Sequence, residues 1–250
     1  MKITCEKEEL LKAVTTVSRL ATTRATLPIL QNIFLSVKKN HLILKATDLE
    51  QTLEVEVVGQ GESDGQLTVP ARVLVEYLQN NTDKSITLTG SDVTLLINST
   101  NHSAKVKGIA ADDYPDLPKI TFQADTSLKS SVLLELVSKT LFAAASDETR
   151  PILTGLLFKF TSDEMTVVGT DGYRLAMASH AVTSTLEGDY ILPKRSLQEL
   201  VRLLGIDEET TLSFSSSQAR IKIGSVTFIT RVMDGNFPPY ESIIPKKSSF

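Results

Sequence analysis

The side chains that most often carry enzymatic chemistry are few and scattered in this sequence. The 3 histidines, His41, His102 and His180, do not have the spacing of metal ligands. The single cysteine, Cys5, has no recognisable general base near it in the sequence. Neither of the common phosphate-binding motifs, G-x-x-x-x-G-K-[ST] and G-x-G-x-x-G, occurs. We therefore expect no catalytic constellation, no metal site and no cofactor.

Paired carboxylates offer the remaining route to acid–base catalysis. Asp112–Asp113 and Glu208–Glu209 are such pairs, but both fall in expected loops or helix ends, where carboxylates are usually solvated. Gly169–Gly172 resembles a phosphate cradle only superficially, because it leads from one expected strand into another without a helix N-terminus to meet a phosphate. A hydrolase or a transferase remains the alternative to a binding protein.

The segment after residue 170 carries side chains suited to recognition. Gly172, Tyr173 and Arg174 follow a Thr-Asp pair, and aromatic and arginine side chains dominate binding hot spots. The structural alternative is a plain turn, since Asp-Gly is a strong hairpin signal. For Tyr173 and Arg174 we favour partner binding.

These residues belong to the second of two copies of one sequence pattern, here called copy one and copy two. A constant shift of 123 residues, without net insertion, relates the two copies and indicates a repeated domain near the commonest domain size. We place copy one at residues 1–122 and copy two at residues 123–250. The segments related by the shift are Leu27–Leu30 and Arg150–Leu153, Thr47–Asp48 and Thr170–Asp171, Pro70 and Pro193, and Tyr114–Pro115 and Phe237–Pro238.

Apolar spacing predicts two helices in each copy. Leucines and valines recur every three or four residues from Leu10 and again from Leu133, which is typical of an amphipathic helix. A second helix follows Pro70 and Pro193, because proline suits a first helical turn. Alternation at 53–57, 85–89 and 219–224 predicts strands with one buried face. We therefore predict an α+β fold in which each copy packs two helices on antiparallel sheet.

Composition excludes several classes of protein. Hydrophobic residues make up 41% of the chain, which is enough for packed cores and argues against wholesale disorder. No apolar run approaches the ~20 residues of a membrane helix, and the charged start of the chain is unlike a signal peptide. One cysteine allows no internal disulfide, so we expect a cytoplasmic protein. The net charge of -4 argues against a uniformly basic nucleic-acid binder but allows one basic face.

Short motifs spread along the chain form an ordered set. They are Met1–Thr4, Leu10–Lys12, Arg24–Leu30, Ala46–Glu50, Val69–Arg72, Thr170–Leu175 and Asp234–Pro238. Together they resemble the bacterial DNA polymerase III beta subunits, the DNA sliding-clamp family. Any one motif alone would be weak, but the set covers the entire chain in order and agrees with the repeat. The fold that this resemblance implies is a tandem array of DNA-clamp domains.

The resemblance implies a processivity factor that encircles duplex DNA. Each family subunit has three such domains, and two subunits close head-to-tail into a homodimeric ring. This sequence holds two domains and stops at Lys246–Phe250, where a linker to a third would run. We therefore expect a fragment that is unable to close the ring, because the family's subunit interface joins domain one to domain three of the partner.

A clamp that slides must contact phosphates rather than bases, and Lys and Arg on the inner helices would supply that attraction. Arg72 and Arg195 are equivalent in the repeat and run against the helix dipole, which favours anions at a helix start. The plainer alternative is that scattered basic side chains merely solvate helix surfaces. The candidate DNA contacts are Lys12, Arg19, Arg24, Arg72, Lys194 and Arg195, of which the resemblance supports Arg24 and Arg72 most directly.

The resemblance also implies a hydrophobic pocket in copy two that captures short peptides from the DNA polymerase and clamp-loader subunits. A Leu or Phe anchor would fill an apolar slot, with polar groups on its rim. Leu153 is nearly as well explained by the core, and many family members carry histidine where this chain has Tyr173. The expected pocket residues are Arg150, Leu153, Thr170, Gly172, Tyr173, Arg174, Leu175, Pro238 and Ile243.

This sequence also departs from the family pattern. Some members place a glutamine and paired aromatics where this chain has Asp147 and Pro151–Ile152, so aromatic contacts to DNA are not expected there. A structural protein that assembles edge to edge through its sheets is the third class, beside a clamp and an enzyme. A clamp predicts Lys and Arg gathered on the helical face, whereas plain assembly predicts no such asymmetry.

Overall fold

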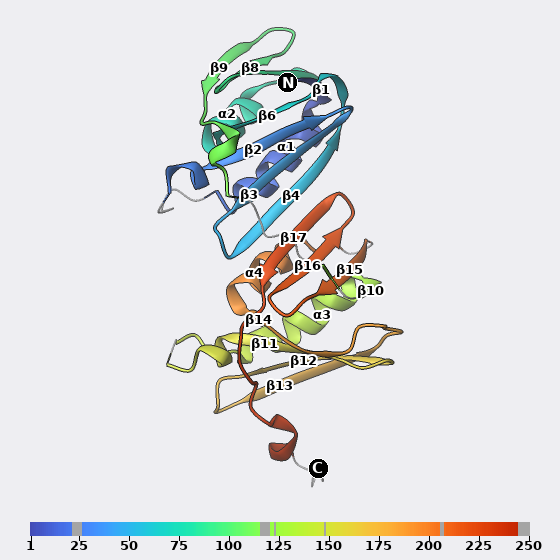
Figure 1. Cartoon of the computed structure of the whole chain (residues 1–250). Coiled ribbons are helices and arrows are strands. Elements are labelled where there is room, and N and C mark those ends of the chain that lie inside the picture. Colours follow the sequence, from blue (N-terminus) through green and yellow to red (C-terminus); the bar gives the residue numbers. More distant parts are fainter. Residues whose placement is uncertain (22–26, 116–120, 123, 148, 206–207, 245–250) are drawn as a thin grey trace. The chain divides into compact units, whose positions relative to one another are not determined.

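The computed structural model describes residues 1–21, 27–115, 121–122, 124–147, 149–205 and 208–244 (Figure 1). The chain separates into two compact units, the first comprising residues 1–120 and 220–230 and the second comprising residues 121–219 and 231–250. The division into 1–122 and 123–250 stays a prediction. Within the described ranges, no helix has both the length and the apolar character needed to cross a membrane.

Two amphipathic helices form one layer of the first unit. Helix α1 (Lys7–Ser18) buries Leu10, Val14 and Val17 at helical spacing. Helix α2 (Ala71–Asn80) begins directly after Pro70, as the sequence predicted. The two helices pack against each other, and α1 also packs on strands β3 (His41–Thr47) and β4 (Gln51–Val58), behind which it lies in Figure 1.

Antiparallel strands form the rest of the first unit. One sheet has the order β5-β1-β7-β8-β9. In a second group, β4, β3, β2 and β6 pair in that order, and β17 pairs with β4 through residues 226–230. The remaining bounds are β1 (Lys2–Glu6), η1 (Pro28–Gln31), β2 (Asn32–Lys38), β5 (Gln60–Ser63), β6 (Gly65–Pro70), β7 (Ser85–Ser91), β8 (Thr94–Asn98), β9 (Ser103–Lys107), η2 (Ala111–Asp113) and β17 (Val226–Arg231).

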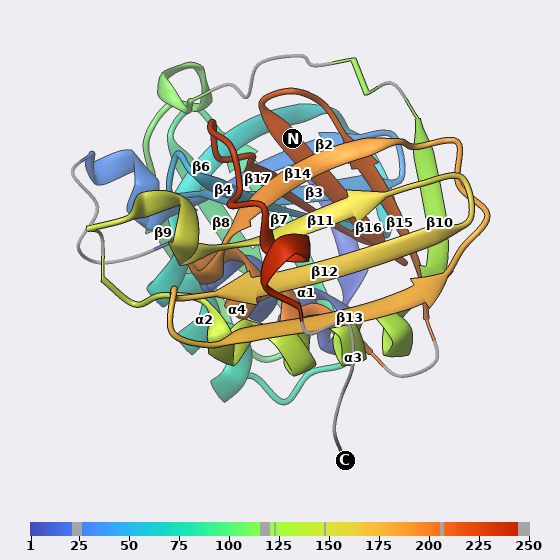
Figure 2. The ribbon, with the colours of Figure 1, turned by 90° about the horizontal axis from the view of Figure 1, so that it is seen from below.

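The second unit repeats this design. Strands β13 (Leu175–Ala181), β12 (Glu164–Thr170), β11 (Gly155–Phe160) and β14 (Gly188–Pro193) form an antiparallel sheet in that order (Figure 2). Helix α3 (Ser130–Thr140) packs on β13 and β12, and α4 (Lys194–Leu203) follows β14 directly. The other elements of this unit are β10 (Asp125–Lys129), which pairs with β15 (Glu209–Phe214), η3 (Leu141–Ala143), η4 (Pro151–Thr154) and η5 (Tyr240–Ile243). Strand β16 (Gln218–Ile223) is divided between the units, since residues 220–223 belong to the first.

The 123-residue repeat of the sequence is also a repeat of structure. The bounds of β1 and β10, of β3 and β12, of β6 and β14, and of α2 and α4 all differ by 123 residues at both ends. The predicted α+β class, with two helices on antiparallel sheet in each copy, is confirmed. Strand β5 has no strand at the equivalent place in the described part of copy two.

Candidate functional site

The turn between β12 and β13 is a closed hydrogen-bonded frame. Asp171 Oδ1 accepts the backbone N–H groups of Tyr173 and Arg174, both at 3.0 Å. Thr170 Oγ1 accepts the N–H of Gly172 at 3.1 Å and donates to the Arg174 carbonyl at 2.6 Å. Gly172 has a φ of 92°, a region that side chains with a Cβ rarely adopt. The Asp-Gly pair therefore makes the turn that its sequence predicts.

This frame presents Tyr173 to solvent, where its side chain is 100% exposed. Arg174 Nε donates to Asp171 Oδ2 at 2.9 Å, so the guanidinium is held beside the turn. This bond, helped by the N–H groups of Tyr173 and Arg174, lowers the pKa of Asp171 to about 2. A wholly exposed aromatic ring can bury apolar area against a partner. Aromatic and arginine side chains of this kind are enriched in binding hot spots.

A cavity of about 260 Å³ opens beside the turn. Residues 171–173 line it, together with Ala145, Asp147, Thr149, Arg150 and Leu153. Buried Leu153 supplies an apolar surface, whereas Asp147, Arg150 and Asp171 make the lining strongly polar. The cavity thus brings together four of the nine predicted pocket residues, which are Arg150, Leu153, Gly172 and Tyr173.

The other five predicted pocket residues do not line this cavity. Thr170 is 5% exposed and holds the turn, and Arg174 pairs with Asp171. Leu175 packs with Ile152, Phe237 and Ile244 against a buried cluster of Leu157, Val168, Ile191 and Tyr240. Pro238 and Ile243 are exposed, the latter by 67%.

Four lining residues were not among the predicted pocket residues, and they are Ala145, Asp147, Thr149 and Asp171. Asp147 Oδ1 accepts the Thr149 N–H at 3.1 Å and also the Thr149 hydroxyl. These bonds, with the charge of Arg150, lower the pKa of Asp147. An Asp followed two residues later by Thr is the pattern of such a turn, so the sequence did contain a signal for this part of the wall.

The predicted DNA contacts lie on or near the helices. Arg72 is the second residue of α2 and Arg195 the second of α4, as predicted. The Arg72 side chain is 82% exposed, and its Nε lies 2.7 Å from Glu76 Oε1. Lys12, Arg19 and Arg195 are exposed, whereas Lys194 is half-buried and bonds to the loop after α3. Arg24 lies outside the described residues.

The helices are more basic than the chain as a whole. Together the four α-helices of the described ranges carry seven Lys or Arg and five Glu, a net charge of +2, against -4 for the chain. Three of these basic side chains form an ion pair with a Glu of their own helix. The pairs are Arg72–Glu76, Lys139–Glu135 and Arg202–Glu199. The asymmetry has the sign that a DNA-facing helical surface requires, although it is small.

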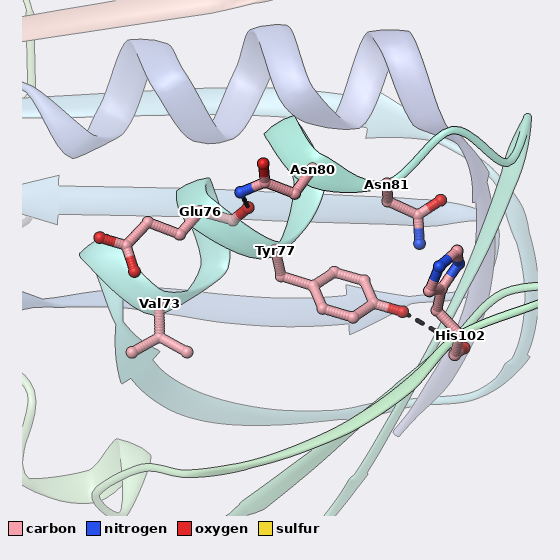
Figure 3. A pocket seen from close by; sticks show the side chains of 6 residues that line it. All are labelled: Val73, Glu76, Tyr77, Asn80, Asn81 and His102. Atoms are coloured by element: carbon pink, nitrogen blue, oxygen red, sulfur yellow. Dashed lines mark hydrogen bonds between the residues drawn. The ribbon is translucent and has the colours of Figure 1, made fainter.

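A second cavity, of about 360 Å³, lies in the first unit between α2 and the β8–β9 loop (Figure 3). Its lining residues are Val73, Glu76, Tyr77, Asn80, Asn81 and His102. The Tyr77 hydroxyl points toward His102 and donates to its carbonyl at 3.3 Å (Figure 3). No predicted site residue lines this cavity.

Groups with catalytic potential do not converge in the part of the chain that the structure describes. Burial, followed by the nearby Glu9 carboxylate, raises the pKa of the Cys5 thiol to about 11, so the reactive thiolate is suppressed at neutral pH. His102 Nδ1 lies 3.5 Å from Asp83 Oδ2. The neighbouring Ser99 hydroxyl bonds to the His102 carbonyl, at 3.3 Å, and to the Asp83 carboxylate, but not to the imidazole that would have to activate it. No three His, Cys, Asp or Glu side chains among the described residues come together as a metal site would require.

Comparison with known proteins accounts for this arrangement. Residues 1–118 match the family model of the DNA polymerase III beta subunit, N-terminal domain, and residues 127–239 match that of its central domain. The beta sliding clamp of Synechococcus elongatus is 33% identical to this chain, over 99% of this chain and 68% of its own length. The beta sliding clamp of Escherichia coli K12 is 32% identical, over 98% of this chain and 68% of its own length. The crystal structure of the DNA polymerase III subunit beta from Pseudomonas aeruginosa superposes with a TM-score of 0.95 at 31% identity, over 100% of this chain and 69% of that one. The chain belongs to the DNA polymerase III beta subunit family, the sliding clamps that serve as non-catalytic processivity factors of that polymerase.

Proposed function

We propose that this chain holds duplex DNA without sequence preference and tethers replication proteins through short peptides bound at the β12–β13 turn and its cavity. The observation that carries the proposal is the turn itself: a rigid frame exposes Tyr173 completely beside a cavity that contains Leu153 and Arg150. The apolar cluster under Leu175 extends the surface on which a peptide would lie.

Peptide binding is supported by what the turn offers to a ligand. Burial of the exposed Tyr173 ring against an apolar anchor removes nonpolar area from water, at roughly 25 cal/mol per Å². Arg150 and Arg174 provide N–H donors for the carbonyl and carboxylate groups of a peptide. Since Asp171 fixes Arg174 before binding, little conformational entropy is lost when the ligand arrives.

DNA binding is supported by the exposure of the Lys and Arg side chains on or near the helices. The Arg72–Glu76 pair is open to solvent on both sides, and such pairs contribute about 0–1 kcal/mol. A phosphate can therefore replace Glu76 as the partner of Arg72 at small cost. Arg195 occupies the equivalent place in copy two, and Lys12, Arg19 and Arg24 would add to the attraction. On the family resemblance, we propose that the full-length protein is a head-to-tail homodimer that closes a ring around DNA.

Titration of a labelled polymerase-tail peptide, beside a scrambled peptide, tests the peptide site. Saturable binding of the native peptide alone is expected. The double variant Tyr173→Ala, Arg174→Ala should lose that binding. The double variant Leu49→Ala, Glu50→Ala, which changes two exposed residues of the equivalent turn in copy one, should retain it. Equal binding by both double variants would remove the β12–β13 turn from the proposal.

Retention on duplex DNA at low salt tests the basic residues. The double variant Arg24→Ala, Arg72→Ala should dissociate at a lower salt concentration than the unmutated chain, equally for different DNA sequences. Unchanged retention would take these two residues off the list of contacts.

A further inference from the structure

Lys194 stands where the sheet and the cavity wall of the second unit meet. Strands β14 and β11 pair so that Pro193 lies opposite Gly155, the residue that follows η4. Helix α4 therefore starts, at Lys194, beside the segment that leads from η3 to η4. Four of the eight residues that line the 260 Å³ cavity come from this segment, namely Ala145, Asp147, Thr149 and Arg150, and a fifth, Leu153, comes from η4.

The Lys194 ammonium is bonded to the base of that segment. Its Nζ donates to the Ala144 carbonyl at 2.9 Å and to Ser146 Oγ at 3.1 Å. Between these two residues, the Ala145 N–H donates to the Leu153 carbonyl at 2.8 Å and closes the segment into a loop. The lysine thus holds both residues that flank the closing hydrogen bond.

Local helix stability does not explain a lysine at this position. A cation in the first turn of a helix opposes the helix dipole, which favours anions there. In copy one the equivalent residue is Ala71, which is buried with 4% exposure and has no group to reach a loop. The lysine occurs in the copy that has the cavity and the exposed Tyr173.

We propose that Lys194 is a positioning residue of the peptide-binding cavity and not a DNA contact. It fixes the wall that presents Asp147, Arg150 and Leu153 to a peptide, and its N–H groups are already directed to that wall. This inference rests on the proposed peptide-binding function and replaces the role in DNA binding that the sequence suggested for this residue.

The test compares Lys194→Met with Lys139→Met in the full chain. Lys139 is an exposed lysine on α3 that pairs with Glu135 of its own helix, so its replacement makes the same change of charge without touching the loop. Lys194→Met should bind the labelled polymerase-tail peptide roughly fivefold to tenfold more weakly, as expected for loss of charge-assisted hydrogen bonds, and Lys139→Met should bind it normally. Lys194→Arg, which keeps the donors, should recover binding to within about twofold.

Two further measurements separate positioning from a general loss of stability. Ser146→Ala removes one acceptor, so its effect on peptide affinity should be less than additive with that of Lys194→Met. Hydrogen exchange at the Ala145 amide should accelerate in Lys194→Met and stay unchanged in Lys139→Met. DNA retention should fall no further in Lys194→Met than in Lys139→Met.

The outcomes distinguish this inference from the function on which it rests. Normal peptide binding by Lys194→Met with an unchanged Ala145 exchange rate would overturn the positioning role and leave the peptide site intact. Failure of the unmutated chain to bind the peptide would instead overturn the proposed function. Exchange at Ala145 would then still decide whether Lys194 holds the loop.

Discussion

Thr47 and Thr170 make the same hydrogen bond in the two copies of the domain. Each Oγ1 donates to the backbone carbonyl four residues later, at 2.7 Å to Gln51 and at 2.6 Å to Arg174. Each also accepts the N–H two residues later, at 3.1 Å in both turns. The backbone frame of the proposed peptide site is therefore present twice, and the two turns differ in the side chains that they display.

This pair of threonines provides a matched test. Thr170→Val should lower the free energy of unfolding by about 1 kcal/mol, because it removes the hydrogen bonds of two partly buried backbone groups, and should weaken peptide binding as the turn loosens. Thr47→Val should cost a similar free energy of unfolding and leave peptide affinity unchanged. Chemical denaturation and peptide titration measure the two effects. Equal loss of peptide affinity in both variants would mean that the turn acts only through global stability.

The third residue of each turn has a positive φ, 76° at Leu49 and 92° at Gly172. A left-handed conformation costs roughly 1–2 kcal/mol for a residue with a Cβ. Gly172→Ala should therefore lower the free energy of unfolding by about 1–2 kcal/mol. Leu49→Gly should raise it by up to about 1 kcal/mol, because relief of strain outweighs the entropy that glycine loses. Thermal melts of both variants check the opposite signs, and a shift in the same direction would contradict the argument.

Glu76 should limit the contribution of Arg72 to DNA binding, since the two side chains pair at 2.7 Å. Glu76→Gln removes the competing charge and should let the chain stay on duplex DNA at higher salt. Arg72→Ala should act in the opposite direction and reduce the slope of log affinity against log salt by about 0.9. Binding measured at several salt concentrations checks both. Weaker retention by Glu76→Gln would contradict this, and would show that Glu76 orients Arg72 for DNA binding rather than competing with phosphate for it.

The hydrogen bonds of Asp171 in the β12–β13 turn should be lost only at a low pH. The pKa of Asp171 is lowered to about 2, whereas an unfolded aspartate titrates near ~3.9. Because the folded value is the lower one, the ionised Asp171 stabilises the turn fully above pH ~4, and this stabilisation disappears as the pH falls through about 2. Carboxyl NMR titration should find the low midpoint, and Arg174→Met should move it upward. A midpoint near the unfolded value in the unmutated chain would contradict the observed hydrogen bonds.

Much of the fold was predictable because the same pattern of helices and strands occurs in both copies of the sequence repeat. Pro70 and Pro193 predicted where α2 and α4 begin, and the period-two alternation at 53–57 and 85–89 predicted parts of β4 and β7. Strand β5 was not predicted, since Gln60–Ser63 lacks alternation and depends on pairing with β1, which is distant in sequence. Propensity and periodicity are local signals, so pairing between distant segments escapes them.

The candidate site was predictable in part. Comparison of the copies pointed to the turn at 170–174, and the structure places Arg150, Leu153, Gly172 and Tyr173 around one cavity. Asp147 and Thr149 were not assigned to the cavity, because its wall depends on the closure of a loop by the Ala145–Leu153 hydrogen bond. The bonding of Lys194 to that loop depends on the register of β11 against β14, which no local pattern reveals. DNA and peptide contacts of individual residues stay predictions.

Because the turn occurs twice, an exposed side chain of one copy can be replaced by that of the other. Since the hydrogen bonds around Thr47 and Thr170 use backbone groups and the threonine and aspartate side chains, the exposed residues Glu50 and Tyr173 can vary without rebuilding the loop. A gene that carries the turn twice can alter one surface by mutation while the other keeps its ancestral one. Grafting Gly-Tyr onto the exposed positions 49 and 50 would accordingly be the shortest route to a chain with a second docking point.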